Sequence, residues 1–228
     1  MVRYMKIVVL IIASGESYTK QYAEMESVWL KYMNLFPDKF ECYFIKSNPD
    51  LDAEIKVDKN TIWVRREENI IPGIITKTVL AIEYALSNTQ FDYLVRTNMS
   101  SVINLPLLYN LLPIYEKKYP VHYFGSYNPH HGGYIEGSCI VLSRFACQYL
   151  CKHVNLSSTM IDDVTIGNTL YPHFTVTHYP KKDVLQYTHL SKLTPTDIGN
   201  YFHYRCKSHD HLETTQIMEA IVKTIFSV

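Results

Sequence analysis

The sequence predicts an α/β fold: a single-domain α/β/α sandwich with a mostly parallel central sheet. Short runs of apolar and β-branched residues alternate with longer segments whose apolar side chains recur at helical spacing. Hydrophobic residues make up 47% of the 228-residue chain, which is enough to cover both faces of a sheet. Neither an internal repeat nor a linker interrupts the chain, so we expect residues 1–228 to form one domain.

The stretch at residues 6–13, which is apolar from Ile7 onward, predicts the first strand, because a strand buried on both faces lacks polar alternation. Further strands are predicted where short aliphatic and aromatic runs stand between turn-forming residues. These runs lie at residues 40–45, 61–64, 93–96, 123–125, 139–142 and 174–178.

Helices are predicted where apolar side chains recur every three or four residues, as at Ile75, Val79 and Ile82. Ser143 is the expected N-cap of one helix, and Pro113 interrupts another. The expected helices lie at residues 20–32, 74–86, 105–119, 144–153 and 212–226, and residues 160–167 lead into a further short helix. Residues 181–211 are polar and rich in histidine, and we expect them to be irregular.

The charge balance and the cysteines limit the functional classes. Lys plus Arg and Asp plus Glu each number 22, so no basic excess points to nucleic acid. The five cysteines form no Cys-x-x-Cys pair, which favours a reducing compartment. The apolar run at residues 7–13 is too short to cross a membrane. We expect a cytoplasmic or otherwise soluble protein, or one of the Golgi lumen if a membrane anchor has been removed.

The pattern of residues 91–104 predicts a buried strand that ends in a polar turn at residues 97–101. Open α/β sheets bind ligands at the carboxyl ends of their strands, so Asn98 is a candidate ligand-binding residue. The alternative is that Asn98 and Ser101 only cap the turn and the following helix. No Gly-x-Gly-x-x-Gly or P-loop motif is present to anchor a dinucleotide or P-loop interpretation.

Two adjacent carboxylates, Asp162 and Asp163, precede a helix-forming stretch. The dipole of a helix N-terminus keeps a carboxylate ionised, which suits a base that takes a proton from a hydroxyl group. Plain N-capping is the alternative, and both roles are compatible. The adjacent His130 and His131 are weaker metal candidates, because a metal site needs ligands from several segments. Asp50-Leu51-Asp52 follows a proline, and we interpret it as a solvated loop.

Four blocks of the sequence lie at residues 76–86, 91–104, 134–144 and 162–167. In this order they resemble the galactosyltransferase/fringe-type glycosyltransferases of family 31, which have the GT-A fold. In the second block, Arg96 and Thr97 stand at the family's Lys-Thr pair and Asn104 at its closing Asn. In the fourth, Asp162 and Asp163 stand at its Glu-Asp pair.

The chain departs from this family at the acidic triplet that binds its metal ion, which falls on Asn98-Met99-Ser100. A hard divalent cation prefers carboxylate oxygens, and these residues carry none. The family's late histidine ligand falls on His178 or His189. Two outcomes remain open: metal-independent transfer, or a weak Mn²⁺ or Mg²⁺ site built from Asn98, His189 and phosphate oxygens.

The resemblance implies an inverting glycosyltransferase that moves a sugar from a nucleotide sugar, with a UDP-sugar expected, to a hydroxyl of a glycan or glycoprotein. Asp163 would be the catalytic base, and Asp162 would orient the neighbouring loop. Arg66 and His189 are further candidates for neutralising the diphosphate. The residues implied for donor binding are Ala13, Ser14, Gly15, Arg65, Lys77, Arg96, Thr97, Asn98, Ser100, Glu136, Gly137 and Ser138.

Two alternatives compete with this interpretation. One is a catalytically silent relative that binds a nucleotide sugar or a glycan and has lost its metal triplet. The other is a different nucleotide-sugar enzyme whose blocks match by chance. The presence of Asp163 favours an enzyme, because a binding protein does not need a base.

Overall fold

The computed structural model describes residues 4–15, 19–118, 121–130, 133–178, 184–186, 191, 193–194, 198–208 and 210–228. The strands and helices within these residues follow in chain order. They are β1 (Ile7–Ile12), α1 (Thr19–Tyr32), β2 (Phe40–Ser47), β3 (Ile55–Asp58), β4 (Thr61–Val64), α2 (Gly73–Asn88), β5 (Tyr93–Asn98), β6 (Ser101–Ile103), α3 (Leu105–Glu116), β7 (Tyr123–Asn128), β8 (Tyr134–Ser143), α4 (Arg144–His153), α5 (Asp162–Leu170), β9 (Val176–His178), β10 (Val184–Gln186), β11 (His203–Arg205) and α6 (His211–Phe226).

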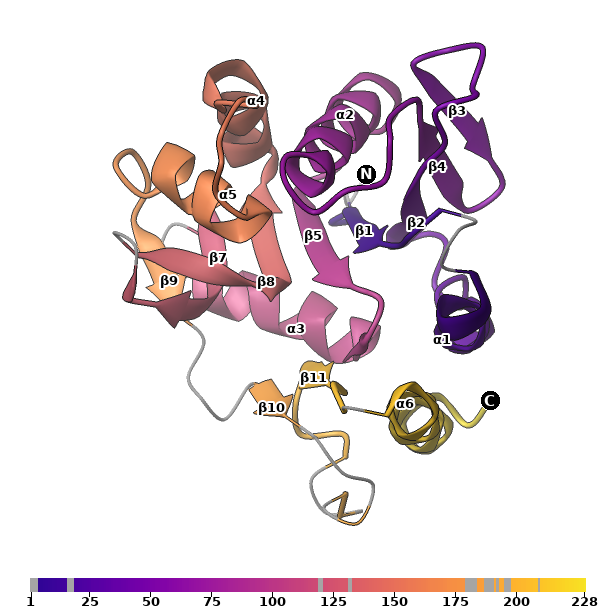
Figure 1. Ribbon diagram of the computed structural model, residues 1–228. Helices are drawn as coiled ribbons and strands as arrows, with labels where there is room; N and C mark the ends of the chain where they lie inside the picture. The colour runs from indigo at the N-terminus through magenta and orange to yellow at the C-terminus, as the bar shows by residue number, and fades with distance from the viewer. Residues whose placement is uncertain are drawn as a thin grey trace.

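The large sheet has the strand order β3-β4-β2-β1-β5-β8-β7-β9. Strands β4, β2, β1 and β5 are paired in parallel, and so are β7 and β9. Strand β8 runs antiparallel to both β5 and β7, and β3 runs antiparallel to β4. Helices α2, α4 and α5 cover one face of the sheet, whereas α1, α3 and α6 lie on the other (Figure 1). The expected α/β sandwich with a mostly parallel sheet is therefore confirmed.

Strand β1 is apolar throughout because each of its two faces lies in a hydrophobic core. Ile7, Val9 and Ile11 belong to the core beneath α1, α3 and α6. Val8 and Leu10 belong to the core beneath α2, α4 and α5. All five side chains are completely buried, because successive residues of a strand point to opposite faces of the sheet.

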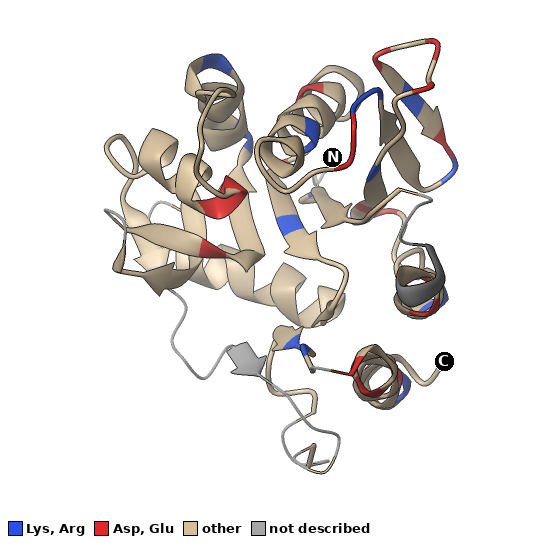
Figure 2. Ribbon diagram, viewed as in Figure 1, with Lys and Arg blue, Asp and Glu red and all other residues tan. Residues whose placement is uncertain are grey.

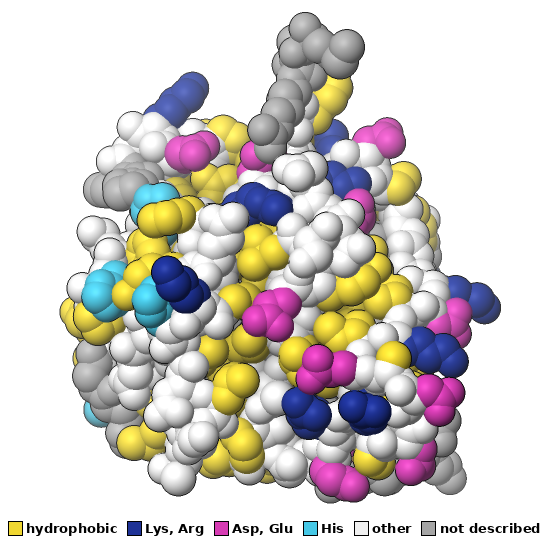
Figure 3. All heavy atoms as spheres, turned by 90° about the horizontal axis from the view of Figure 1, so that it is seen from above, with side chains coloured by type: hydrophobic (Ala, Val, Ile, Leu, Met, Phe, Trp, Pro, Cys, Tyr) yellow, Lys and Arg dark blue, Asp and Glu magenta, His cyan; other side chains and the backbone are white. Residues whose placement is uncertain are grey.

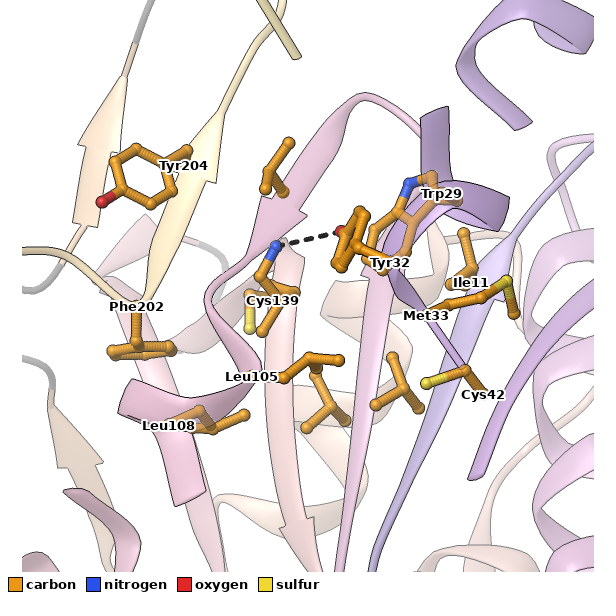
Figure 4. Packing of buried hydrophobic residues seen from close by; sticks show 14 of the residues in the cluster. Ile11, Trp29, Tyr32, Met33, Cys42, Leu105, Leu108, Cys139, Phe202 and Tyr204 are labelled. Carbon is orange, nitrogen blue, oxygen red and sulfur yellow. Dashed lines mark hydrogen bonds between the residues drawn. The ribbon is translucent and has the colours of Figure 1, made fainter. Parts of the chain in front are cut away.

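Two aromatic side chains of α1 anchor the connection between β5 and β6. The indole Nε1 of Trp29 donates a hydrogen bond to the carbonyl oxygen of Met99 at 2.9 Å. The backbone N–H of Ile103 donates to the hydroxyl oxygen of Tyr32 at 3.3 Å, the contact drawn as a dashed line in Figure 4. Both aromatic rings are fully buried. The backbone beside Asn98 is therefore fixed by the core.

Most expected elements are present, but several short strands were not predicted. Residues 101–103 form β6 instead of ending a turn, and β10 and β11 lie in the segment expected to be irregular. Strand β11 pairs with β6, about 100 residues away, so local periodicity carries no signal of it. Strand β3 was also missed, and β8 begins at Tyr134, ahead of the predicted start.

Helix α3 is shorter than predicted. It ends at Glu116 and contains Pro113 within its last turn. A proline removes the hydrogen bond to the carbonyl oxygen one turn earlier, so it weakens the helix before Pro113 and does not itself set the end at Glu116. Among the described residues, no helix is both long and apolar enough to cross a membrane.

Candidate functional site

Two adjoining cavities lie where β1 and β5 end. The first has a volume of about 430 Å³ and the second of about 400 Å³. Ile74, Asn98 and Arg205 line both cavities, so the two meet at these side chains. The carboxyl ends of parallel strands are where open α/β sheets bind ligands.

The first cavity brings together several of the residues implied for donor binding. Ala13 and Ser14 reach it from the end of β1, and Asn98 and Ser100 from the end of β5. Its opposite wall comes from the C-terminal part of the chain, which sequence reasoning did not include. The lining residues there are Arg205, Lys207, Ser208, His211 and Thr214.

Lys77 borders this cavity, but its ammonium group is already bound to other groups of the protein. Its Nζ donates to the carbonyl oxygen of Ala13 at 2.7 Å and lies 2.6 Å from Oε1 of Glu68. The other carboxylate oxygen of Glu68 accepts from the N–H of Gly15 at 3.2 Å. The Lys77 side chain is 1% exposed, and burial lowers its pKa while Glu68 acts in the opposite direction. The Lys77–Glu68 pair therefore positions the loop after β1.

Arg96 joins three elements around the second cavity. Its guanidinium forms an ion pair with Asp162 at the start of α5 and donates to the carbonyl oxygen of Gly137 on β8. It also donates to Oδ1 of Asn98 at 2.9 Å. The side chain is almost entirely buried. Its positive charge is thus already matched by Asp162.

Asp163 borders the second cavity, held in a defined orientation. Its Oδ2 accepts from the N–H of Gly137 at 2.9 Å, and its Oδ1 accepts from the N–H of Val164 at 2.9 Å. Burial raises the pKa of Asp163, and neighbouring Asp162 adds to the increase, whereas both hydrogen bonds and Arg96 oppose it. A carboxylate with a raised pKa is a better proton acceptor than an ordinary aspartate.

Gly137 has no room for a side chain. A Cβ atom there would lie 2.8 Å from Nη1 of Arg96 and 3.2 Å from Oδ2 of Asp163. The glycine therefore lets the backbone of β8 approach both charged groups at once. Glu136 and Ser138, its neighbours on β8, also line the second cavity.

Thr97 faces the interior instead of a cavity. Its hydroxyl donates to the carbonyl oxygen of Ser138 at 2.8 Å, and the side chain is completely buried. The hydroxyl of Ser101 donates to the same carbonyl at 3.3 Å and lies 3.3 Å from Nε2 of His203. His203 is also completely buried, so this Ser–His pair is inaccessible to a substrate and joins β5, β6, β8 and β11.

The other predicted residues either lie away from the two cavities or are not described by the structure. Arg65 is exposed, lines neither cavity and donates to the carbonyl oxygen of Asp52 at 3.5 Å. Asp50 and Asp52 are exposed in a loop, as predicted. His189 lies outside the described residues, and the structure does not describe the side chain of His178.

Arg205 is the main residue that sequence reasoning missed. It ends β11 and lines both cavities. In Figure 2, β5 and β11 each carry a basic residue, and β8 and the start of α5 carry acidic residues. Burial lowers the pKa of Arg205, with Glu136 and Asp163 acting in the opposite direction. No motif marks this arginine, because its place depends on the pairing of β11 with β6.

The residues at the family's metal-binding position do not fit a divalent cation. Oδ1 of Asn98 already accepts from the Arg96 guanidinium, and the Met99 side chain is buried in the core. Arg205 adds a second positive charge nearby. Among the described residues, no group of three or more His, Cys, Asp or Glu side chains has the arrangement of a metal site.

A third cavity, of about 610 Å³, lies at the opposite end of the central strands. It is lined by residues such as Phe91, His122 and Arg144 and contains none of the predicted site residues. Arg144 donates there to the carbonyl oxygens of Leu86 and Thr89, which is a structural role. We therefore locate the candidate site at the two smaller cavities.

No protein-family model matches the chain, and no curated protein sequence matches it. Among solved structures it is similar to a glycosyltransferase involved in the glycosylation of the major capsid of PBCV-1. The TM-score is 0.56 at 13% sequence identity, covering 94% of this chain and 99% of that one. The galactosyltransferase LgtC, solved with donor and acceptor sugar analogs, gives a TM-score of 0.49 at 9% identity, covering 97% of each chain, too low to carry an argument. The chain therefore has the fold of the PBCV-1 glycosyltransferase over nearly its whole length.

Proposed function

We propose that the protein is an inverting glycosyltransferase that uses a nucleotide sugar, with a UDP-sugar the expected donor. The observation that carries the proposal is the position of Asp163 and Asn98 on one cavity at the end of β5. The fold shared with the PBCV-1 glycosyltransferase supports it. So does the resemblance of four sequence blocks to family 31.

In this proposal the nucleotide lies in the first cavity, beside Ala13, Ser14 and Asn98. The sugar extends past Asn98 into the second cavity, toward Glu136 and Asp163. The two cavities share their lining at Asn98, so one extended donor can occupy both. Figure 3 shows acidic, basic and apolar side chains interspersed on one face of the molecule, a mixture that suits an amphipathic sugar acceptor.

The reaction is a single displacement. Asp163 takes the proton of an acceptor hydroxyl while the hydroxyl oxygen forms a bond to the anomeric carbon. The bond between that carbon and the diphosphate oxygen breaks, and its electron pair leaves with the nucleoside diphosphate. Attack from the face opposite the leaving group inverts the anomeric configuration. The hydrogen bonds from Gly137 and Val164 orient the carboxylate of Asp163 for this step.

A catalytically silent binding protein is the second candidate, and the neutral Asn98-Met99-Ser100 segment favours it. The raised pKa of Asp163 and its place on the cavity favour the enzyme. A thermal-shift screen of nucleotide sugars, with EDTA and with Mn²⁺, identifies the donor. A glycan acceptor panel analysed by mass spectrometry then separates the two candidates. The proposal predicts a sugar–acceptor product, whereas donor binding without any product across the panel supports the binding protein.

A further inference from the structure

We propose that Arg205, supported by Lys207, is the binding site for the diphosphate of the donor and takes the place of a metal ion. This inference rests on the proposed function and adds the residues that bind the leaving group. Arg205 lies at the junction of the two cavities, which is where the diphosphate falls if the nucleotide fills the first and the sugar the second.

The other cations near this junction are already paired within the protein. Lys77 binds Glu68 and the carbonyl oxygen of Ala13, and Arg96 binds Asp162. Among the described residues, by contrast, no carboxylate lies within ion-pair distance of Arg205 or Lys207. Their charges are therefore available to an anionic ligand.

The backbone of Arg205 is held in place on both sides. Strand β11 pairs with β6, with Arg205 opposite Ser101, and the N–H of Cys206 donates to the carbonyl oxygen of Ser100 at 2.9 Å. Tyr204 and Cys206, on either side, are completely buried. A guanidinium carried on a fixed strand is preorganised for an anion, whereas a loop side chain would need to be ordered on binding.

The chemistry of a diphosphate also suits binding by Arg205. Each phosphate of a diphosphate presents a pair of anionic oxygens. Two parallel N–H groups of a guanidinium can donate to such a pair at once. Arg205 is half-buried, so an anion beside it would offset its desolvation. When the glycosidic bond breaks, the electron pair stays on the diphosphate, and Arg205 stabilises that charge. Lys207 is exposed at the rim of the first cavity and adds a second charge.

The test is calorimetric titration of UDP, inorganic pyrophosphate and uridine, in EDTA, into the wild type and four variants. Arg205→Gln and Lys207→Gln remove the proposed charges, and Arg205→Lys retains one without the two-pronged geometry. Lys223→Gln is the matched control, because it removes one exposed charge from α6 and lines neither cavity. Thermal unfolding of each variant checks that it is folded.

We expect Arg205→Gln to weaken UDP and pyrophosphate binding about ten- to a hundredfold. Uridine binding should stay unchanged, since uridine has no phosphate. Arg205→Lys should recover part of the affinity, Lys207→Gln should lose less than Arg205→Gln, and Lys223→Gln should match the wild type.

Equal UDP affinity of the wild type, Arg205→Gln and Lys207→Gln would overturn the diphosphate site and leave the proposed function standing. Wild-type UDP binding that disappears in EDTA and returns with Mn²⁺ would also overturn it. Failure of the wild type to bind any nucleoside diphosphate or nucleotide sugar, with or without Mn²⁺, would instead overturn the proposed function.

Discussion

The backbone N–H of Gly137 donates a hydrogen bond to Oδ2 of Asp163 at 2.9 Å, which joins β8 to the first turn of α5. The same glycine presents its carbonyl oxygen to Arg96, whose guanidinium is paired with Asp162. One residue without a side chain therefore positions both the proposed base and the ion pair beside it.

Gly137→Ala should disturb the proposed base. The added methyl group would lie 2.8 Å from Nη1 of Arg96 and 3.2 Å from Oδ2 of Asp163, so at least one of these groups must move. We expect turnover to fall about a hundredfold, since a small displacement of a reacting group has an effect of this size. UDP affinity should change by less than about threefold, because Gly137 does not line the first cavity. Wild-type turnover in this variant would contradict the arrangement.

The rate should depend on pH through Asp163. The base acts only when ionised, so kcat/KM should fall as the pH decreases through a pKa above 3.8, the ordinary value of this group. Burial raises that pKa, which places the decline at a higher pH than for an exposed aspartate. A pH–rate profile of the wild type checks this, with the exposed-loop variant Asp52→Asn as control. An apparent pKa of 3.8 or lower for the decrease in kcat/KM would contradict the expected upward shift of the Asp163 pKa.

Lys77→Met should destabilise the protein by about 3 kcal/mol, because it leaves a largely buried carboxylate of Glu68 and the carbonyl oxygen of Ala13 without their partner. The double variant with Glu68→Gln should recover part of this loss, since the unpaired charge is then removed. Urea unfolding of the wild type, both single variants and the double variant measures the coupling. A loss below about 0.5 kcal/mol in Lys77→Met would show that the pair does not support the loop after β1.

His203 should make stability depend on pH. Burial lowers its pKa from 6.5 to about 3, so the folded protein resists a proton that the unfolded chain accepts. Its contribution is fully present above pH 6.5 and decreases as the pH falls toward 3. The loss attributable to His203 should reach about 2 kcal/mol by pH 5, at 1.36 kcal/mol per pH unit.

Urea unfolding of the wild type and His203→Gln at pH 7 and pH 5 isolates this contribution from that of the other histidines. The wild type should lose more stability between the two pH values than the variant does. The same loss in both proteins would show that His203 is not responsible.

The sequence was sufficient to predict strands and helices where the pattern depends on residues close together in the chain. The stretch at residues 6–13 predicts a strand buried on both faces, and Ile75, Val79 and Ile82 predict the inward face of α2. Helix α4 begins after Ser143, whose hydroxyl accepts from the N–H of Ala146 as an N-cap should.

The sequence was insufficient where a role depends on contacts between distant segments. Arg205 borders the cavities because β11 pairs with β6, and a three-residue strand has too few positions to show a periodic pattern. The sequence predicts both Lys77 and Arg96 as diphosphate-binding cations. In the folded chain, however, Lys77 forms an ion pair with Glu68, and Arg96 forms one with Asp162. Both positive charges are therefore already paired within the protein.

The central claim is that Asp163 is the base for transfer from a donor bound beside Asn98, and Asp163→Asn tests it most directly. Asparagine is nearly isosteric with aspartate and can still accept the hydrogen bond from Gly137, but it cannot take a proton. Once the donor is identified, single-turnover transfer and donor affinity should be measured for the same preparation. We expect donor affinity within about threefold of the wild type and transfer reduced at least a hundredfold. Transfer at the wild-type rate by the folded variant would contradict the account.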